Sequence, residues 1–150
     1  MILLKKKKNL IFICSHNDVR SQIAEAFLRN YASSEFNAFS AGFRIHAISP
    51  LTYMVMKEVG LKLTNHHPKV LKEFLRKYHF VIAISFCGKD EVLCPIFPGI
   101  ATQLFWDIED PSTFQGSKQE KLEKFREIRN KIEAKVQQFL RNTNEIQVIP

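Results

Sequence analysis

The sequence lacks any long hydrophobic run. None of the apolar stretches among its 150 residues approaches the roughly 20 residues that a membrane-spanning helix needs. Its first residues, Met-Ile-Leu-Leu, precede four lysines, whereas a secretory signal carries its charge before a longer apolar core. We therefore expect a cytoplasmic protein with no membrane partner.

Cysteine is also scarce, at three residues: Cys14, Cys87 and Cys94. Cytosolic thiols stay reduced, so cysteines there serve catalysis or redox chemistry more often than they form structural disulfides. The first follows the apolar run 10–13, and the other two come after the apolar run 80–84. This placement predicts reactive thiols near the ends of buried strands.

Motifs for nucleic-acid recognition are missing as well. The formal net charge is +7, but the four lysines at 5–8 and a C-terminal segment of mixed charge supply much of it. The sequence has no recognition-helix signature, zinc-finger spacing or aromatic sheet motif. We expect no nucleic-acid partner and interpret the charge as a solvated surface that attracts small anions.

Internal repeats are absent, and short apolar runs alternate with amphipathic segments. Strands are predicted at 10–13, 36–40, 80–84 and 102–106, and helices at 20–31, 49–60, 68–78 and 118–140. Ser49 and Pro50 are the expected N-terminus of the second helix. Helical spacing places Tyr31, Leu75 and Tyr78 on buried faces.

This alternation predicts an α/β fold. We expect a single three-layer domain over residues 1–150, with its core at about 9–140. A short parallel sheet of about four strands would carry helices on both faces. Ligands of such sheets bind beyond the carboxyl ends of the strands, where Cys14, Cys87 and Asp107 are expected.

The segment from Cys14 to Ser21 joins the first strand to the first helix. A turn there presents backbone N–H groups and the positive end of the helix dipole to an anion, and Arg20 adds a planar fork of donors. The same field favours the Cys14 thiolate, to which Ser21 can donate a hydrogen bond. Asn17 tolerates the left-handed conformation that a tight loop often needs. The pattern predicts an oxyanion site lined by Ser15, His16, Asn17, Asp18, Val19 and Arg20.

A candidate general acid follows the last predicted strand. Asp110 precedes Pro111, which restricts the backbone and can hold the carboxyl group in place. A carboxylic acid near a bound oxyanion can protonate a departing oxygen. The alternative for Asp110 alone is a solvated acidic turn, and its expected position near Cys14 favours the acid.

These motifs together resemble one family. Cys14, Arg20, Ser21 and the residues that follow at 22–25 are similar to the active-site loop and first helix shared by low-molecular-weight tyrosine phosphatases and thioredoxin-coupled arsenate reductases. The similarity continues through 40–42, 46–50, 65–66, 94–98 and 110–111, and covers about residues 9 to 140. The resemblance implies a low-molecular-weight tyrosine phosphatase-like fold.

The spacing of Cys87 and Cys94 resembles that of the reductase branch. The resemblance implies a relay in which Cys14 attacks arsenate, Cys87 attacks Cys14 and releases arsenite, and Cys94 attacks Cys87. Thioredoxin then reduces the Cys87–Cys94 disulfide. Each thiol step is a thiolate attack on a sulfur-bound electrophile. Asp110 and Ser21 complete the implied catalytic set, and we expect no metal or tightly bound cofactor.

The loop departs from the family at three positions. The family usually has Gly at the position of His16, a small residue at Asp18 and Cys at Val19. A carboxylate in an anion-binding loop repels substrate unless it points outward or is paired, and His16 is a candidate partner. We expect the side chains of His16 and Asp18 to face solvent while their backbone amides face the anion.

A further departure concerns a cation. One branch of the arsenate reductases has a potassium site built from Asn, Glu, Ser and Asp. Asn17, Glu25 and Ser40 match the first three, and Lys69 stands at the Asp position. The resemblance suggests that the Lys69 ammonium replaces the ion and steadies Asn17 and the loop. A surface lysine at a helix start is the alternative.

Three functions fit these residues. The first is thioredoxin-coupled arsenate reduction, which the later cysteine pair favours. The second is a low-molecular-weight protein tyrosine phosphatase that forms a cysteinyl-phosphate at Cys14, assisted by Arg20 and Asp110. The third is a non-catalytic anion-binding relative, motivated by His16 and Asp18.

Overall fold

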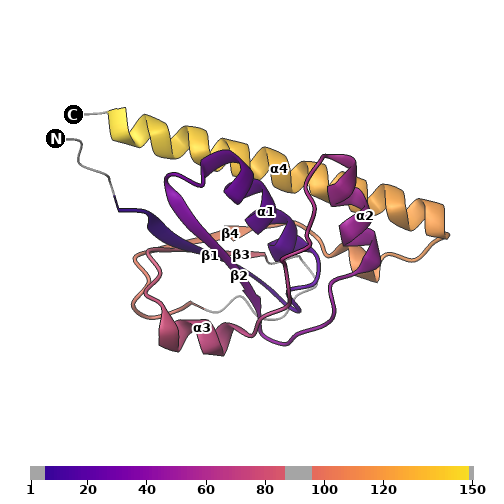
Figure 1. Ribbon diagram of the computed structural model, residues 1–150, viewed down its shortest axis with the longest axis horizontal. Helices are drawn as coiled ribbons and strands as arrows, with labels where there is room; N and C mark the ends of the chain where they lie inside the picture. The colour runs from indigo at the N-terminus through magenta and orange to yellow at the C-terminus, as the bar shows by residue number, and fades with distance from the viewer. Residues whose placement is uncertain (1–5, 87–95, 149–150) are drawn as a thin grey trace.

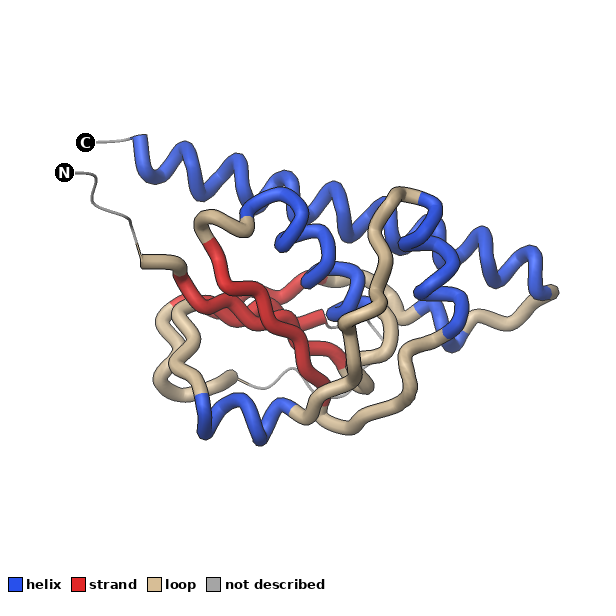
Figure 2. Tube along the Cα trace, in the orientation of Figure 1, coloured by secondary structure: helices blue, strands red, loops and turns tan. Residues whose placement is uncertain are grey.

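The computed structural model describes residues 6–86 and 96–148, with side chains as far as residue 143. It has four strands and four α-helices in these ranges, with one short 3-10 helix (Figures 1 and 2). In chain order they are β1 (Lys8–Cys14), α1 (Arg20–Ala32), β2 (Phe36–Gly42), α2 (Pro50–Glu58), α3 (Leu71–Lys77), β3 (Ile82–Phe86), β4 (Thr102–Trp106), η1 (Pro111–Thr113) and α4 (Lys118–Val148).

Helices cover both faces of one parallel sheet, in which the strands follow the order β2-β1-β3-β4 (Figure 1). Helix α1 packs on β1 and β2 and against α4, and α3 packs against β2 from the opposite side. Alternate residues of β1 serve the two cores: Leu10 and Phe12 face the layer of α1 and α4, whereas Ile11 and Ile13 join Leu71 of α3. The predicted three-layer α/β fold is confirmed.

Three predicted core residues are wrong. Tyr31, Leu75 and Tyr78 have exposed fractions of 43%, 41% and 38%. Helix α3 begins three residues later than predicted and has only seven residues, so it buries only Leu71 fully. Tyr31 lies at the outer edge of α1, where its hydroxyl donates to Glu133 of α4 at 2.6 Å. A phenol needs such a polar partner, and the rim of the helix pair supplies it.

Helix α2 has the predicted N-cap, first residue and terminating glycine, although its helical residues are Pro50–Glu58 and not the whole of 49–60. The Ser49 hydroxyl accepts from the Leu51 amide at 3.3 Å, and Pro50 takes the first helical position. Gly60 follows the helix with a φ of 80° and no neighbour within 4 Å of an added Cβ. Its left-handed conformation ends the helix.

The central strand β1 lies at the point where the strand order reverses. It pairs with β2 on one side and with β3 on the other. Cys14, the last residue of β1, is paired with Gly42, the last residue of β2. The loop that follows Cys14 therefore emerges at the carboxyl edge of the sheet, where open α/β folds bind ligands.

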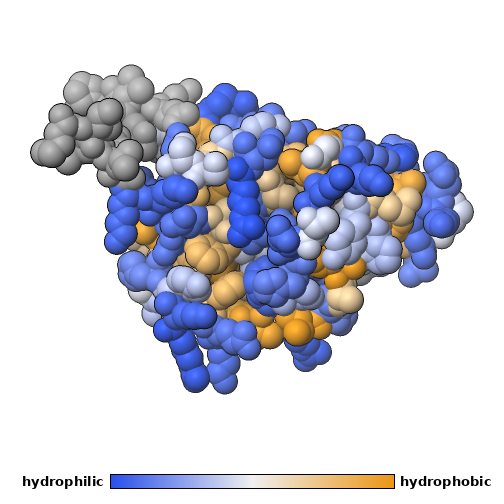
Figure 3. All heavy atoms as spheres, viewed as in Figure 1, coloured by the Kyte–Doolittle hydropathy of each residue, from blue (hydrophilic) through white to orange (hydrophobic). Residues whose placement is uncertain are grey.

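The face of the molecule shown in Figure 3 is mainly polar. Hydrophilic residues predominate on it, with apolar areas between them. No helix within residues 6–86 and 96–148 is long and apolar enough to cross a membrane.

Candidate active site

Cys14 is held beside a hydroxyl group. Its side chain is buried, and its Sγ lies 2.8 Å from the Oγ of Ser21 in α1. The Ser21 oxygen already accepts a hydrogen bond from the side-chain amide of Asn17 at 2.8 Å. Its own proton is therefore available to the sulfur, which is the arrangement that stabilises a thiolate.

Asn17 organises the loop between β1 and α1. It is fully buried, with a φ of 55°, so the left-handed conformation predicted for it is confirmed. Its Nδ2 donates to the hydroxyls of Ser21 and Ser40, the latter at 3.0 Å. Its Oδ1 accepts from the Lys69 backbone amide at 2.8 Å and from Gln22 Nε2 at 3.0 Å. All four hydrogen-bonding positions of the side chain are used, which fixes the loop in one conformation.

Gly42 allows the loop to approach β2. A Cβ at this position would lie 2.6 Å from the Arg44 carbonyl oxygen, 2.7 Å from the Asn17 nitrogen and 2.8 Å from the His16 carbonyl carbon. All three are backbone atoms, which cannot yield as the end of a flexible side chain does. The close approach therefore requires glycine.

A row of backbone hydrogen bonds joins the loop to the segment 44–49. The amides of that segment donate to loop carbonyls at 3.1–3.3 Å, in the pairs Arg44 to Ser15, His46 to His16 and Ser49 to Asp18. Across a trans peptide the N–H points opposite to the C=O. The N–H groups of the same peptides therefore point away from the 44–49 segment, which suits them to bind an anion on the other side.

Arg20 and Asp110 meet at the same edge. Arg20 has an exposed fraction of 1%, and its Nη1 donates to the Ile108 carbonyl at 2.9 Å. Its Nη2 lies 3.8 Å from Asp110 Oδ2, while Asp110 Oδ1 accepts from the amide and hydroxyl of Ser112. Asp110 thus reaches the arginine from a fixed turn. Asp107 directly follows β4 and so lies at this edge as expected, where it lines a surface hollow along α4.

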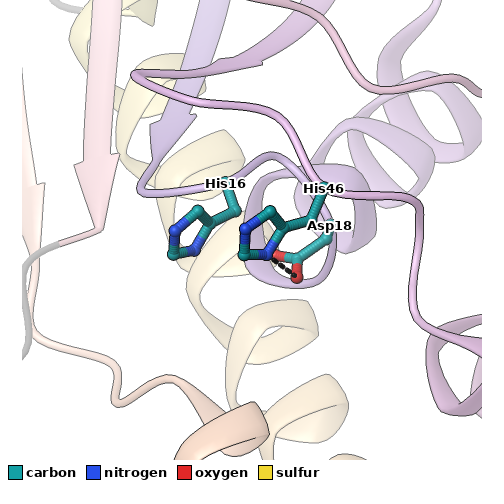
Figure 4. A group of neighbouring side chains, drawn as sticks. All are labelled: His16, Asp18 and His46. Carbon is teal, nitrogen blue, oxygen red and sulfur yellow. Dashed lines mark ion pairs between the residues drawn. The ribbon is translucent and has the colours of Figure 1, made fainter.

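The expected outward orientation of Asp18 is wrong. Its side chain has an exposed fraction of only 13%, and Oδ2 lies 3.9 Å from His46 Nδ1, whereas His16 stacks on the His46 ring (Figure 4). Burial raises the pKa of Asp18, and the charge of Asp110 raises it further, against the opposing effect of the two histidines. The carboxylate is therefore largely covered, and it makes an ion pair with His46 while the nearby His16 also favours its charged form.

Glu25 forms a second buried charged group behind the loop. His66 Nδ1 lies 3.0 Å from its Oε2, and Lys69 Nζ lies 3.9 Å from its Oε1. Burial raises the pKa of Glu25, but the hydrogen bond with His66 and the charges of Lys69 and Arg29 outweigh it, so the pKa lies below its usual value. Burial lowers the pKa of Lys69, and Glu25 opposes that shift. The Lys69 ammonium thus contacts Glu25, whereas only the Lys69 backbone contacts Asn17.

The structure brings together most of the predicted site residues. Cys14 contacts Ser21 at the sheet edge, and Asp110 lies beside Arg20. Cys87 and Cys94 lie outside the described residues. Sequence reasoning gave no role to Gln22, Gly42, His46 or His66. Only Gly42 carried a readable indication, as a glycine that ends a predicted strand beside the loop.

A parallel sheet with a buried thiol, an arginine and a carboxylate at its switch point is an arrangement suited to a cysteine enzyme that acts on an oxyanion. The chain belongs to the low molecular weight phosphotyrosine protein phosphatase family, whose model matches residues 9–148. It is 33% identical over 134 residues to an arsenate reductase of Oceanobacillus iheyensis, covering 89% of this chain and 95% of the relative. It is 30% identical to an arsenate reductase of Bacillus subtilis, covering 89% and 96%.

Solved structures agree with this assignment. An arsenate reductase in a phosphate-binding state superposes with a TM-score of 0.75 at 25% identity, over 90% of this chain and 98% of that one. A thioredoxin-dependent arsenate reductase of Corynebacterium glutamicum has a TM-score of 0.60 at 30% identity, over 90% and 64%. A low molecular weight tyrosine phosphatase of T. tengcongensis shares the fold with a TM-score of 0.72 at 19% identity, over 91% and 99%.

Proposed function

We propose that this protein reduces arsenate to arsenite through a relay of its three cysteines, with thioredoxin as the final reductant. The observation that carries the proposal is the Cys14–Ser21 contact of 2.8 Å inside a loop that also holds Arg20. The arsenate reductases named above support the choice of substrate, because they match this chain over nearly their whole length.

The first step uses the residues of the loop. The Cys14 thiolate attacks arsenic, and Asp110, which must take up a proton before this step, gives that proton to the departing oxygen, which leaves as water. Arg20 and the loop amides bind the remaining oxygens. Ser21 donates its hydrogen bond to the attacking sulfur before the step and loses that thiolate partner as the S–As bond forms.

The second step transfers two electrons to arsenic. Cys87 attacks the Cys14 sulfur, a disulfide forms, and the S–As electron pair stays on arsenic, which leaves as arsenite. Cys94 then attacks Cys87 and releases the Cys14 thiolate, and the thioredoxin dithiol reduces the Cys87–Cys94 disulfide. The spacing of the two later cysteines in the sequence supports this part of the proposal.

A phosphatase is the second candidate, and Asp110 beside Arg20 favours it. Cys14 would attack phosphorus, Asp110 would protonate the leaving alcohol, and water would hydrolyse the cysteinyl-phosphate. This chemistry uses the same loop but needs neither Cys87 nor Cys94.

Disulfide mapping separates the two functions. Reduced protein is incubated with arsenate, alkylated and mapped by mass spectrometry. The reductase gives a Cys87–Cys94 disulfide in the wild type and none in Cys14→Ser. Three free thiols with rapid aryl-phosphate hydrolysis identify the phosphatase, and no reaction with either substrate identifies a non-catalytic anion-binding protein.

We further propose that the Lys69 ammonium takes the place of a potassium ion beside Glu25. The 3.9 Å contact and the 13% exposed fraction of the lysine side chain support this over a surface lysine. Wild-type activity is expected to stay constant when potassium replaces sodium, and Lys69→Ala is expected to lose activity until potassium is added. A strong rise in wild-type activity with potassium contradicts the proposal, as does full activity of Lys69→Ala without the cation.

A further inference from the structure

Three side chains with metal-binding atoms converge beside the loop (Figure 4). His16 and Asp18 come from the loop, and His46 comes from the segment that runs alongside it. One nitrogen or carboxylate oxygen from each lies within 4.8 Å of the others, the only such group in the part of the chain that the structure describes. Two imidazoles and a carboxylate are a donor set that binds Zn²⁺ and other divalent transition metals.

The backbone holds the three residues together independently of their side chains. The His46 amide donates to the His16 carbonyl at 3.2 Å, and the Asp18 carbonyl accepts from both the Ser49 amide and the Thr52 hydroxyl at 3.3 and 3.1 Å. The donor atoms are thus brought close by the same hydrogen bonds that shape the loop. A ligand set that is already assembled binds an ion at a lower ordering cost.

The two rings must reorient to share one ion. The His16 and His46 rings are stacked, with centroids 3.9 Å apart and planes 8° from parallel. Because imidazole lone pairs lie in the ring plane, the His46 ring would have to turn before both nitrogens could bind one ion at the usual distance of about 2.0–2.1 Å. The His46 side chain has an exposed fraction of 60%, which leaves room for that rotation and for entry of the ion from solvent.

The charges at the loop give such an ion a role. Asp18 belongs to the loop and Asp110 lies 3.8 Å from Arg20, so two carboxylates stand beside the proposed oxyanion site, where negative charge opposes anion binding. An ion on Asp18 would replace that repulsion by attraction. We propose that His16, Asp18 and His46 bind a divalent transition-metal ion, for which Zn²⁺ is the probe, and that this ion strengthens oxyanion binding by the adjacent loop. The effect of the ion on oxyanion binding rests on the proposed oxyanion site, whereas the binding of the metal does not.

Equilibrium dialysis of the reduced full-length chain against Zn²⁺ tests the site. Thiols also bind zinc, so the comparison is between variants that keep all three cysteines: wild type, His46→Gln, and His79→Gln as a control at an exposed histidine before β3. His46→Gln is expected to bind zinc at this site about tenfold or more weakly than wild type and His79→Gln. At a free zinc concentration near the wild-type dissociation constant, it should therefore hold less zinc than either. Asp18→Asn is expected to weaken zinc binding at the same site. Equal zinc binding by wild type and His46→Gln overturns the proposal.

Calorimetry with inorganic phosphate tests the electrostatic role. One equivalent of Zn²⁺ is expected to tighten phosphate binding by wild type about threefold or more and to leave His46→Gln unchanged. Zinc binding at the cluster with unaltered phosphate affinity overturns the role of the ion in oxyanion binding. Zinc binding without any phosphate binding refutes the proposed oxyanion site and leaves the metal site standing.

Discussion

Replacing Gly42 with Ala is a direct test of how closely the loop must approach β2. The added methyl group would lie 2.6 Å from the nearest backbone atom, whereas real Cβ contacts shorter than 3.0 Å are essentially never seen and ordinary contact begins at 3.4 Å. The loop must therefore retreat by the difference, between 0.4 and 0.8 Å. The displaced atoms belong to Asn17 and His16 in the loop between β1 and α1, and to Arg44, whose amide donates to that loop.

The expected loss follows from that displacement. A misplacement of about 1 Å in a catalytic site can cost about 100-fold, so we expect arsenate turnover to fall about 10- to 100-fold. This corresponds to about 1.4–2.7 kcal/mol of transition-state stabilisation. Overpacking of this kind also lowers the free energy of unfolding by about 1–3 kcal/mol.

The assay couples arsenate reduction to thioredoxin oxidation, and calorimetry measures phosphate affinity separately. Gly60→Ala is the matched control, because its φ of 80° strains an alanine by about 1–2 kcal/mol while no atom near it must move. Both variants should lose stability, but only Gly42→Ala should lose turnover and phosphate affinity per folded molecule. Wild-type phosphate affinity in Gly42→Ala would refute the requirement for close approach.

Three further substitutions test other parts of the structure. Ser21→Ala removes a hydrogen bond to a thiolate worth about 1.5–3 kcal/mol, so arsenite formation in a single turnover should slow about 10- to 100-fold, and Ser21→Thr should retain most of the rate. Asp18→Asn should raise the free energy of unfolding at neutral pH. The folded-state pKa of Asp18 is raised, so the wild type loses stability as the pH rises above the ordinary aspartate pKa. Urea titrations should therefore show that the difference in unfolding free energy between Asp18→Asn and wild type is largest at neutral pH and shrinks towards about pH 4. Ile132→Ala removes a fully buried side chain on α4 and should lower the free energy of unfolding, measured in urea, by about 2–5 kcal/mol. A decrease of less than about 1 kcal/mol would contradict the predicted packing.

Local patterns were sufficient to predict the sheet. Continuous apolar runs predict β1 and β3, which are buried on both faces, although β3 lies two residues later than predicted. The edge strands β2 and β4 are also found where they are predicted, and β4 has the predicted bounds. Helix α4 was recognised from its long apolar periodicity, although its end was placed eight residues too early. The short helix α3 was overextended, because Leu75 and Tyr78 keep helical spacing without a layer to cover them.

Part of the candidate site can likewise be predicted from local sequence, and part cannot. The positions of Cys14, Arg20 and Ser21 follow from a strand, a turn and a helix that are contiguous in the sequence. The orientation of Asp18 does not, because it depends on His46 and Asp110, which other segments bring to it. Pairing between distant loops is set by the path of the whole chain, and a single sequence gives no direct measure of that path.

Position 69 supports the loop through its main chain. Its amide donates to Asn17, and its carbonyl accepts from the Gly42 amide at 2.9 Å, so the peptide backbone links the loop to the end of β2 whatever the side chain is. Only proline would remove the donated bond. The side chain is thereby free to vary in charge without releasing the loop, so the cation that faces Glu25, here the Lys69 ammonium, is set by a single side chain and not by the fold of the turn.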